Sequence, residues 1–338
     1  MNPFAQLNRP ILSAETQRSP EVLHETLAQT LQSPSASLSD VKAQLHALRP
    51  WLVGLDPQSR YAEVSKYFAG ARTLSWLWGK AYHISNDLLR AYGFLQDLAV
   101  FLVAERKDRF MEDWLFVELS KEDEAALDTN ARLWRATLWR SLILAELVFA
   151  TSSTLCLDAP ILRLFNLHDK RRSFPSDPSP GRTSAWPAVL IIVGHVGPND
   201  CSSTNVRLYE DLIRYAEGFE KKKQQNHFPA LSVGCKLRLC HPTRPNAEPF
   251  LRQLKLQQEL DRDDLPANRA TFKARASLME LIKRAEVVLS LDDPQGALGW
   301  LQQTKHAYQT AFAQRGVMNI VREKIVNALG DSRKPSQH

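Results

Sequence analysis

The apolar residues of this 338-residue chain recur mostly at the spacing of an α-helix. Residues 22–32 carry leucines at every fourth position. The next segment, for which Ser39 or Asp40 is a suitable cap, carries a stripe made of Val41, Leu45, Leu48 and Leu52. Residues three and four apart share one face of a helix, so both segments predict a helix with a single buried side.

A longer helical region is expected from about residue 59 to residue 105. Its first apolar stripe runs from Val64 to Trp78 and its second from Leu88 to Leu102, with an interruption around residues 79–85. Polar residues, among them Gln96 and Asp97, stand between the positions of the second stripe. Ser85 or Asn86 is placed to cap this second helix, and Ser120 to cap another over residues 122–153.

Two short runs in the second half of the chain break the helical pattern. Residues 188–193 are rich in β-branched side chains and end at Gly194, and residues 231–239 form a second candidate strand. We therefore predict a small strand pair near residues 186–240. Helices are expected again over residues 207–223, 248–260, 270–289, 294–314 and 317–329.

The composition favours a mainly α fold. The chain has only 13 glycines, about half the usual frequency, which argues against a sandwich, a barrel or a dinucleotide-binding α/β fold. Apolar residues make up 44% of the chain, enough for a sizeable core and too many for a disordered protein. We predict an amphipathic helical bundle with the small strand pair as an addition.

Prolines and serines suggest where the chain is divided. We expect a flexible N-terminal segment over 1–38, a helical domain over 39–168, a Pro/Ser-rich linker over 169–187, a mostly helical C-terminal region with an irregular insert over 188–330, and a tail over 331–338.

Candidate chemistry is sparse. Phosphate-loop, dinucleotide-binding and serine-hydrolase motifs are absent from the sequence. Cys235, Cys240 and His241, with Cys201 and His227 upstream, are residue types that bind zinc, but their spacing does not give the two close pairs of a zinc ribbon. We therefore expect no metal and no cofactor.

Two further groups could serve an enzyme. His195 and Asp200 could form a base–carboxylate pair in the loop after the predicted strand. An acidic segment could supply paired carboxylates, although a solvated polar connector explains it as well. Its members are Asp108, Glu112, Asp113, Glu118, Glu122, Asp123 and Glu124. We expect a protein that is not an enzyme.

Net charge and targeting signals give little direction. The formal charge is +6, and the longest basic run is only Lys221–Lys223, so nucleic acid is not an expected partner. No apolar secretory signal begins the sequence, so an intracellular location with reduced cysteines is expected.

The most apolar stretch, residues 136–157, contains Glu146, whose insertion into lipid would cost about 2–4 kcal/mol. It is either a buried core helix or a helix in or against a membrane. Tryptophans and arginines precede it: Arg132, Trp134, Arg135, Trp139 and Arg140. Such a stripe fits a core flanked by charge, a membrane-surface contact, or base stacking on single-stranded nucleic acid.

Residues 60–155 resemble the N-terminal half of the peroxisomal membrane-elongation proteins, the peroxin-eleven family. The resemblance is carried by Trp78-Gly79, Asp87-Leu88-Leu89-Arg90, Gln96, Glu105, Asp113-Trp114, Arg132-Leu133-Trp134-Arg135 and Ser141-Leu142. It implies a peroxisomal membrane protein whose amphipathic helices bind and bend the outer leaflet before fission. The chain departs from the family at residues 278–312, which are amphipathic and charged where the family has a glycine-containing apolar segment.

Two functions follow as expectations. The first is a membrane-associated helical protein of the peroxisomal membrane. The second is a soluble cytoplasmic adaptor that binds a protein partner through residues 247–330, and a homo-oligomer fits either. The residues expected to contact a membrane or a partner are Trp78, Leu88, Arg90, Leu95, Leu102, Trp134, Arg135, Trp139 and Arg140.

Overall fold

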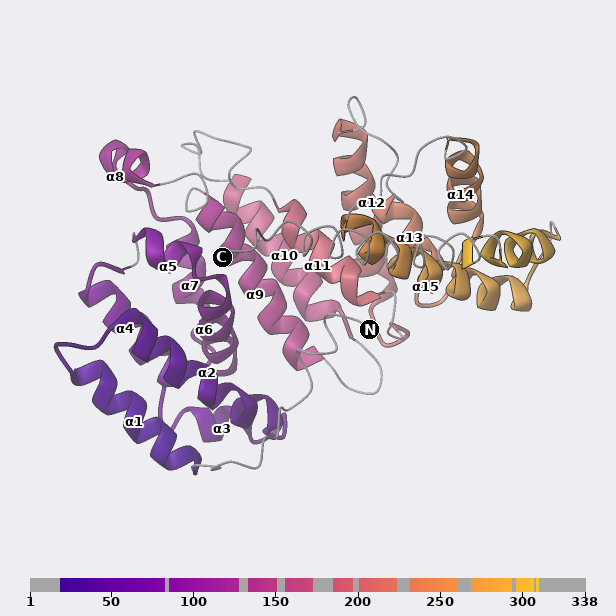
Figure 1. Ribbon diagram of the computed structural model, residues 1–338. Coiled ribbons are helices and arrows are strands. Elements are labelled where there is room, and N and C mark those ends of the chain that lie inside the picture. The colour runs from indigo at the N-terminus through magenta and orange to yellow at the C-terminus, as the bar shows by residue number, and fades with distance from the viewer. Residues whose placement is uncertain are drawn as a thin grey trace, which may run out of the picture. The chain divides into compact units, whose positions relative to one another are not determined.

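The computed structural model describes residues 19–82, 85–127, 133–150, 156–172, 185–196, 201–223, 232–260, 269–293, 296–306 and 308–309. Over these residues the fold is built of helices and contains no strand, which confirms the mainly α prediction (Figure 1). The chain divides into two compact units after Phe219, and each is described by itself.

The first unit contains α1 (Pro20–Gln32), α2 (Leu38–Gly54), α3 (Arg60–Val64), α4 (Ala69–Gly79), α5 (Asn86–Arg90), α6 (Tyr92–Ala104), α7 (Asp108–Leu115), α8 (Lys121–Ala126), α9 (Trp134–Ala150), α10 (Asp158–Arg172), α11 (Trp186–Val196) and most of α12 (Val206–Lys223). The second unit contains α13 (Val233–Leu239), α14 (Glu248–Leu260), α15 (Arg269–Leu291) and a further helical stretch over residues 297–306.

The core of the first unit is built around α6 and α9, which pack against each other more extensively than any other pair of helices. Helix α6 also contacts α2, α4 and α7, and every residue from Phe94 to Leu102 is buried. A helix that is surrounded in this way must be apolar on nearly every side. This explains why Gln96 and Asp97, expected as polar positions, are buried as well.

Two side chains of α2, Arg49 and His46, pair with the buried carboxylate of Asp97. Its carboxylate oxygens lie 2.6 Å from Nη1 of Arg49 and 2.8 Å from Nδ1 of His46. A buried carboxylate is tolerated only when it is paired or hydrogen-bonded, so these contacts also fix α2 against α6.

The amphipathic stripes predicted near the N-terminus are confirmed. Helix α1 covers the first stripe, and Val41, Leu45, Leu48 and Leu52 are all fully buried on α2. The predicted cap of α2 was two or three residues too late. Ser37 accepts a hydrogen bond from the backbone of Asp40, and the Asp40 side chain accepts one from the backbone of Ser37, which completes a capping box.

The helix expected over residues 122–153 is wrong, because α8 ends at Ala126 and α9 begins only at Trp134. Ser120 does cap α8, as predicted, by accepting from the backbone N–H of Asp123. Ser85 likewise caps α5 through the backbone N–H of Leu88.

The predicted strand pair is also wrong. The β-branched run lies in α11, which packs against α9 and α10, and most of residues 231–239 lie in α13. A single strand among helices would leave its backbone N–H and C=O groups without partners, whereas a helix satisfies them within itself. The run is apolar because α11 is buried on most sides, with Leu190 as its exposed position.

The domain boundaries differ from those expected. Residues 20–32 of the supposedly flexible N-terminal segment form α1 and pack against α2 and α4. Helix α10 continues to Arg172 and α11 begins at Trp186, so both ends of the expected linker belong to helices of the first unit. Residues 173–184, and the expected tail over 331–338, lie outside the described residues.

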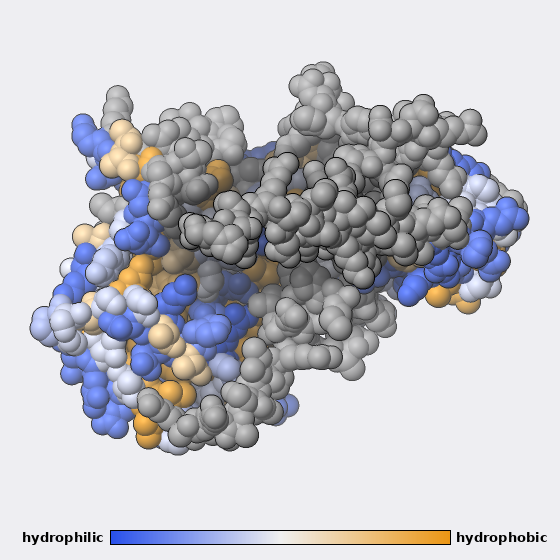
Figure 2. Space-filling view, in the orientation of Figure 1, coloured by the Kyte–Doolittle hydropathy of each residue, from blue (hydrophilic) through white to orange (hydrophobic). Residues whose placement is uncertain are grey.

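Within the described part of the chain, no helix is both long enough and apolar enough to span a membrane. Helix α9, which covers most of the apolar 136–157 stretch, buries Leu138, Leu142, Ile143 and Leu147 inside the first unit. On the face of the molecule seen in Figure 2, apolar residues of the first unit alternate with hydrophilic ones.

Helix α4 is held against α6 by a buried carboxylate. The two oxygens of Glu105, which directly follows α6, accept hydrogen bonds from the backbone N–H groups of Gly70 (2.7 Å) and Ala71 (2.9 Å). These N–H groups belong to the first turn of α4, where they have no partner within the helix. Burial raises the pKa of Glu105 to about 7, while the two N–H bonds act in the opposite direction.

Gly70 is required for this close approach. A Cβ at this position would lie 2.8 Å from Cβ of Phe101 and 3.1 Å from the backbone N of Leu102. The backbone on either side is also constrained, because Phe68 and Arg106 have φ angles of +48° and +55°. A left-handed backbone conformation at a residue other than glycine costs about 1 kcal/mol of folding free energy. The contact between α4 and α6 must therefore offset the strain at Phe68 and Arg106.

A second buried polar residue, His24, lies in an aromatic cluster that joins α1 to α2. Its ring stacks on Tyr67 with 3.8 Å between centroids and meets the edge of Trp51 at 4.7 Å. Its Nε2 atom is buried and has no hydrogen-bond partner among the described residues. Burial lowers the pKa of His24 to about 4, against the opposing effect of Glu21.

The second unit has a core of its own. Residues of α14, α15 and the helical stretch after them pack together, with Leu239 at the end of α13. The buried residues at its centre include Phe250, Leu254, Ile282 and Leu301. The helices expected over residues 270–289 and 294–314 therefore contribute many of their described apolar residues to the core of the unit itself.

We predict that Gly70→Ala destabilises the first unit by about 1–3 kcal/mol, because the added methyl group would push α4 away from α6. Urea unfolding should show a lower midpoint. Gly79→Ala, at the other end of the same helix, is the matched control, since a Cβ there meets nothing within 4 Å. An equal loss of stability in both variants would contradict this role of Gly70.

We also predict that His24 makes the first unit less stable in mild acid. The folded-state pKa of about 4 lies below the ordinary value of 6.5, so the folded protein binds this proton more weakly than the unfolded chain. The stabilisation is present above pH 6.5 and is lost as the pH falls toward 4, by up to about 3 kcal/mol. Unfolding of the wild type and of His24→Phe, compared at pH 7 and pH 5, measures this. Relative to the wild type, the free energy of unfolding of His24→Phe should be higher at pH 5 than at pH 7, because only the wild type loses stability when His24 takes up a proton. An equal difference between the two proteins at both pH values would refute this role of His24.

Candidate functional site

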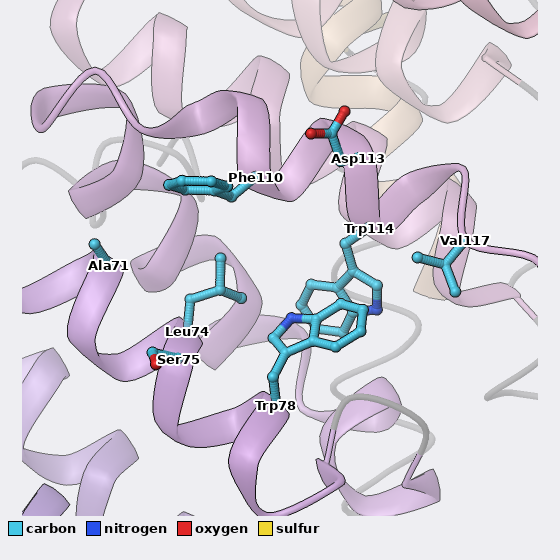
Figure 3. A pocket seen from close by; sticks show the side chains of 8 residues that line it. All are labelled: Ala71, Leu74, Ser75, Trp78, Phe110, Asp113, Trp114 and Val117. Carbon is cyan, nitrogen blue, oxygen red and sulfur yellow. The ribbon is translucent and has the colours of Figure 1, made fainter.

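An open apolar groove of about 370 Å³ lies between α4 and α7 (Figure 3). Side chains from both helices and from the residue two positions after α7 line it. They are Ala71, Leu74, Ser75, Trp78, Phe110, Asp113, Trp114 and Val117. Ser75 and Asp113 are the polar members of this lining, so the groove offers mostly hydrocarbon and aromatic surface.

One wall of the groove is a face of α4. Ala71, Leu74, Ser75 and Trp78 are spaced by three and four residues, so they stand in line along about two helical turns. The opposite face of α4 is buried and includes Gly70, which contacts α6. Helix α4 therefore has two apolar faces, and only one of them is covered by the protein core.

The other wall belongs to α7. Phe110 and Trp114 are four residues apart and share one face of α7, and Val117 extends this wall two residues beyond the end of the helix. The rings of Trp78 and Trp114 meet edge to face with 6.3 Å between their centroids, and Trp114 also contacts Trp134 on α9 at 6.4 Å. Trp114 is nearly fully buried, whereas Trp78 is 38% exposed and Phe110 is 52% exposed.

Helix α7 is fixed in place by an ion-pair network centred on Arg163 of α10. The guanidinium group of Arg163 contacts Asp108 (2.5 Å) and Glu112 on α7 and Glu146 on α9 (2.8 Å). Lys170, also on α10, lies 3.0 Å from the carboxylate of Asp113. The side chains around Arg163 are at most one-fifth exposed, where charge-assisted contacts are screened less by water than on the open surface.

This network explains part of the acidic segment. Three of its carboxylates, those of Asp108, Glu112 and Asp113, pair with Arg163 or Lys170 and serve to hold α7. Glu118 and Glu122, later in the chain, are exposed, as is Asp113. The segment is therefore not a uniform solvated connector, because these three carboxylates have structural partners.

Of the residues expected to contact a membrane or a partner, five are buried in the core of the first unit. Leu88, Leu95 and Leu102 are fully buried, and Trp134 and Trp139 are at most 2% exposed. They cannot contact lipid while this fold is intact. Their apolar spacing results from packing among α5, α6 and α9.

The remaining expected contact residues lie in different places. Trp78 lines the groove. Arg135 donates a hydrogen bond to the backbone carbonyl of Val117 (2.8 Å), and its guanidinium group lies over the ring of Trp134. Arg140 lies over the ring of Tyr92 with 4.5 Å to the ring centre. The side chain of Arg90 is outside the described residues.

The residues considered for catalysis or zinc binding do not converge where the structure describes them. Nδ1 of His195 lies 2.9 Å from the backbone carbonyl of Ile191, one turn earlier in α11, and Asp200 is outside the described residues. His241 accepts hydrogen bonds from the backbone of Thr243 and Arg244 through Nδ1. Among the described residues, no cluster of three or more His, Cys, Asp or Glu side chains has the arrangement of a metal site.

The sequence did not indicate most of the groove, because Asp108, Glu112 and Asp113 belong to the acidic segment, which a solvated polar connector could explain. The signal was present in the spacing of Phe110 and Trp114, which are four residues apart and so share one face of a helix. Glu112 and Asp113 stand between them and obscured the pattern, and of these two Glu112 contacts Arg163 whereas Asp113 lines the groove. What the pattern could not indicate is that this face stays uncovered.

The lining is suited to binding and offers little for catalysis. It contains no histidine, cysteine or lysine, and its one carboxylate, that of Asp113, is paired with Lys170. Apolar clefts edged by a few polar groups are typical binding sites. An exposed tryptophan and phenylalanine beside a buried tryptophan are typical of surfaces that hold protein segments.

Comparison with known proteins identified no relative of this chain. The chain matches no protein-family model, no curated protein and no solved structure. The resemblance of residues 60–155 to the peroxisomal membrane-elongation proteins therefore stays a prediction from the residues that carry it.

Proposed function

We propose that this protein is a helical binding module that holds an apolar segment of a protein partner in the groove between α4 and α7. The observation that carries the proposal is the exposure of Trp78 and Phe110 on two helices whose other faces are packed into the core. When a partner covers large aromatic side chains that are in contact with water at a concave site, the free energy falls, because apolar surface is removed from water.

The dimensions of the groove favour a short helix as its occupant. The wall on α4 extends from Ala71 to Trp78, a rise of about 10 Å, which matches about two turns of a docked helix. Leucine or aromatic side chains spaced three and four residues apart on such a helix would enter between Phe110 and Trp78. Recognition of an amphipathic helix in an apolar groove is a common mode of peptide binding.

This proposal follows the adaptor hypothesis but moves its contact site. Residues 247–330, expected to hold the partner, contribute many of their described apolar residues to the core of the second unit. Of the nine residues expected to contact a membrane or a partner, five are buried in the first unit. The groove, in contrast, is an apolar surface already open in the folded protein.

Binding of a labelled model peptide tests the proposal. The probe is an amphipathic helical peptide about four turns long, with leucines spaced three and four residues apart and equal numbers of Lys and Glu elsewhere. We expect Trp78→Ala and Phe110→Ala each to weaken its affinity at least about tenfold, as measured by fluorescence anisotropy with the full-length protein.

Two variants make this test specific. Ser75→Trp adds a bulky side chain inside the groove without removing a core contact, and it should also reduce peptide binding. Leu190→Ala, which removes an exposed leucine on α11, should leave binding unchanged. Peptide binding that is insensitive to Trp78, Phe110 and Ser75 substitutions would show that the groove is not the binding site.

A further inference from the structure

We infer that proton uptake by Glu105 weakens binding in the groove, so that the groove holds its helix more tightly in weakly alkaline than in weakly acidic solution. This inference rests on the proposed function and concerns how that same site is regulated. It is drawn from the way in which α4, one wall of the groove, is held at its amino end.

Helix α4 has no cap of its own. The residue before it, Phe68, has a left-handed backbone and an apolar side chain that accepts no hydrogen bond. Glu105 supplies the acceptors from far along the chain: its Oε1 accepts from the backbone N–H of Gly70, and its Oε2 from that of Ala71. Because each oxygen holds one N–H group, both bonds need two good acceptors. An ionised carboxylate has them, whereas in the neutral acid one oxygen carries the proton.

The groove and this contact share a residue. The backbone of Ala71 donates to Glu105, and its side chain lines the groove (Figure 3). Helix α4 already contacts α6 closely, since a Cβ at Gly70 would lie 2.8 Å from Cβ of Phe101. When one of the N–H bonds is lost, the first turn of α4 can therefore yield only by moving away from α6. The wall of the groove moves with it.

Opposing effects act on the charge of Glu105. The carboxyl group lies at the amino end of α4, where the positive end of the helix dipole favours a negative charge, but also at the carboxyl end of its own helix, α6, where the negative end disfavours it. The side chain is fully buried, which disfavours the charged form as well. Burial raises the pKa of Glu105 to about 7, against the two N–H bonds and Lys107. The group therefore changes its charge near neutral pH.

The charges around this carboxyl group mostly act elsewhere. Among the described residues, Lys107 is the charged side chain that acts on Glu105, and it favours the ionised form. Charged or titratable side chains on the surrounding elements act on other groups: Arg106 lies over the ring of Tyr61, Arg72 on α4 acts on His24, Glu63 on α3 pairs with Lys66, Arg49 and His46 on α2 pair with Asp97, and Asp108 on α7 and Glu146 on α9 pair with Arg163.

Protonation of Glu105 does not unfold the protein. The folded-state pKa of about 7 lies above the ordinary value of 4.5, so the folded chain binds this proton more tightly than the unfolded chain does. The contribution of this group to the free energy of unfolding therefore rises as the pH falls from 8 to 6. Weaker binding in that range reports a change at α4 and not a loss of the fold.

Binding of the model peptide at two pH values tests the inference. The peptide, acetylated and amidated at its ends, contains only Lys and Glu as titratable residues and keeps its charge between pH 6 and pH 8. We expect the full-length wild type to bind it about three- to tenfold more weakly at pH 6. The upper value is the ratio of the ionised fractions of a group with a pKa of about 7, and it applies when only the ionised form binds.

The possible outcomes separate this inference from the proposed function. Equal affinities at the two pH values, or tighter binding at pH 6, would overturn the inference and leave the groove as the binding site. Absence of peptide binding at both pH values would remove the proposed function and the inference together.

Substitution of the carboxyl group makes the test specific. Glu105→Gln keeps the shape but cannot ionise, and its amide nitrogen cannot accept from the second N–H group. It should bind the peptide at pH 8 about as weakly as the wild type does at pH 6, with no change between the two. Glu63→Gln, the same change at a carboxylate that pairs with Lys66, and His46→Gln, at the histidine that contacts Asp97 of α6, should keep the wild-type profile. A pH dependence that survives in Glu105→Gln, or disappears in His46→Gln, would overturn the inference.

The wild type alone also tests the inference, should Glu105→Gln fail to fold. Carbon NMR of protein labelled at the glutamate carboxyl carbons should show a group that titrates near pH 7, well above the ordinary range of glutamate. Saturation with the peptide should lower the midpoint of that titration, because a ligand that prefers the ionised form favours loss of the proton to the same extent. The inference is overturned when no glutamate titrates near neutral pH, or when the peptide leaves the midpoint unchanged or raises it.

Discussion

The buried carboxylate of Glu105 sets the position of α4, and the groove depends on that position. Two backbone N–H groups at the start of α4 donate to it, and Gly70 lets the helix approach within contact distance of Phe101. Phe68, directly before α4, and Arg106, directly after Glu105, both have left-handed backbone conformations beside this contact. The carboxylate thus satisfies N–H groups that the helix cannot satisfy itself, and its removal from water is compensated by those same bonds.

Other buried polar and charged contacts hold the neighbouring helices of the first unit in the same way. Helix α6 is buried along its length by α2, α4, α7 and α9, so its polar residues need partners within the protein, which Arg49 and His46 supply to Asp97. Helix α7 is held on the far side by Arg163 and Lys170 of α10. Helices α4 and α7 are therefore each anchored to other helices, and the space between them stays open. An open apolar groove with rigid walls is what allows a binding function to be proposed.

The resemblance to a membrane-bending family shows how ambiguous an amphipathic stripe is. Leu88, Leu95 and Leu102 have the spacing of a helix with one apolar side, and a lipid surface or a protein interior would both account for it. In the structure these residues are covered by other helices. The hydrophobic effect depends on apolar area removed from water and does not distinguish the material that covers it. Whether lipid or protein covers an apolar face can be decided only from the tertiary structure.

The sequence by itself determined the helical class, the stripes of α1 and α2, and the caps at Ser85 and Ser120, because these depend on contacts within a few residues. It failed at α11 and α13, where short apolar runs fit a strand as well as a buried helix; in the structure α11 packs against α9 and α10, and α13 packs against α14 and α15. Only the tertiary structure decided that Phe110 and Trp78 remain exposed beside buried Trp114. Spacing tells which residues share a face, but whether that face is covered depends on helices far away in the sequence.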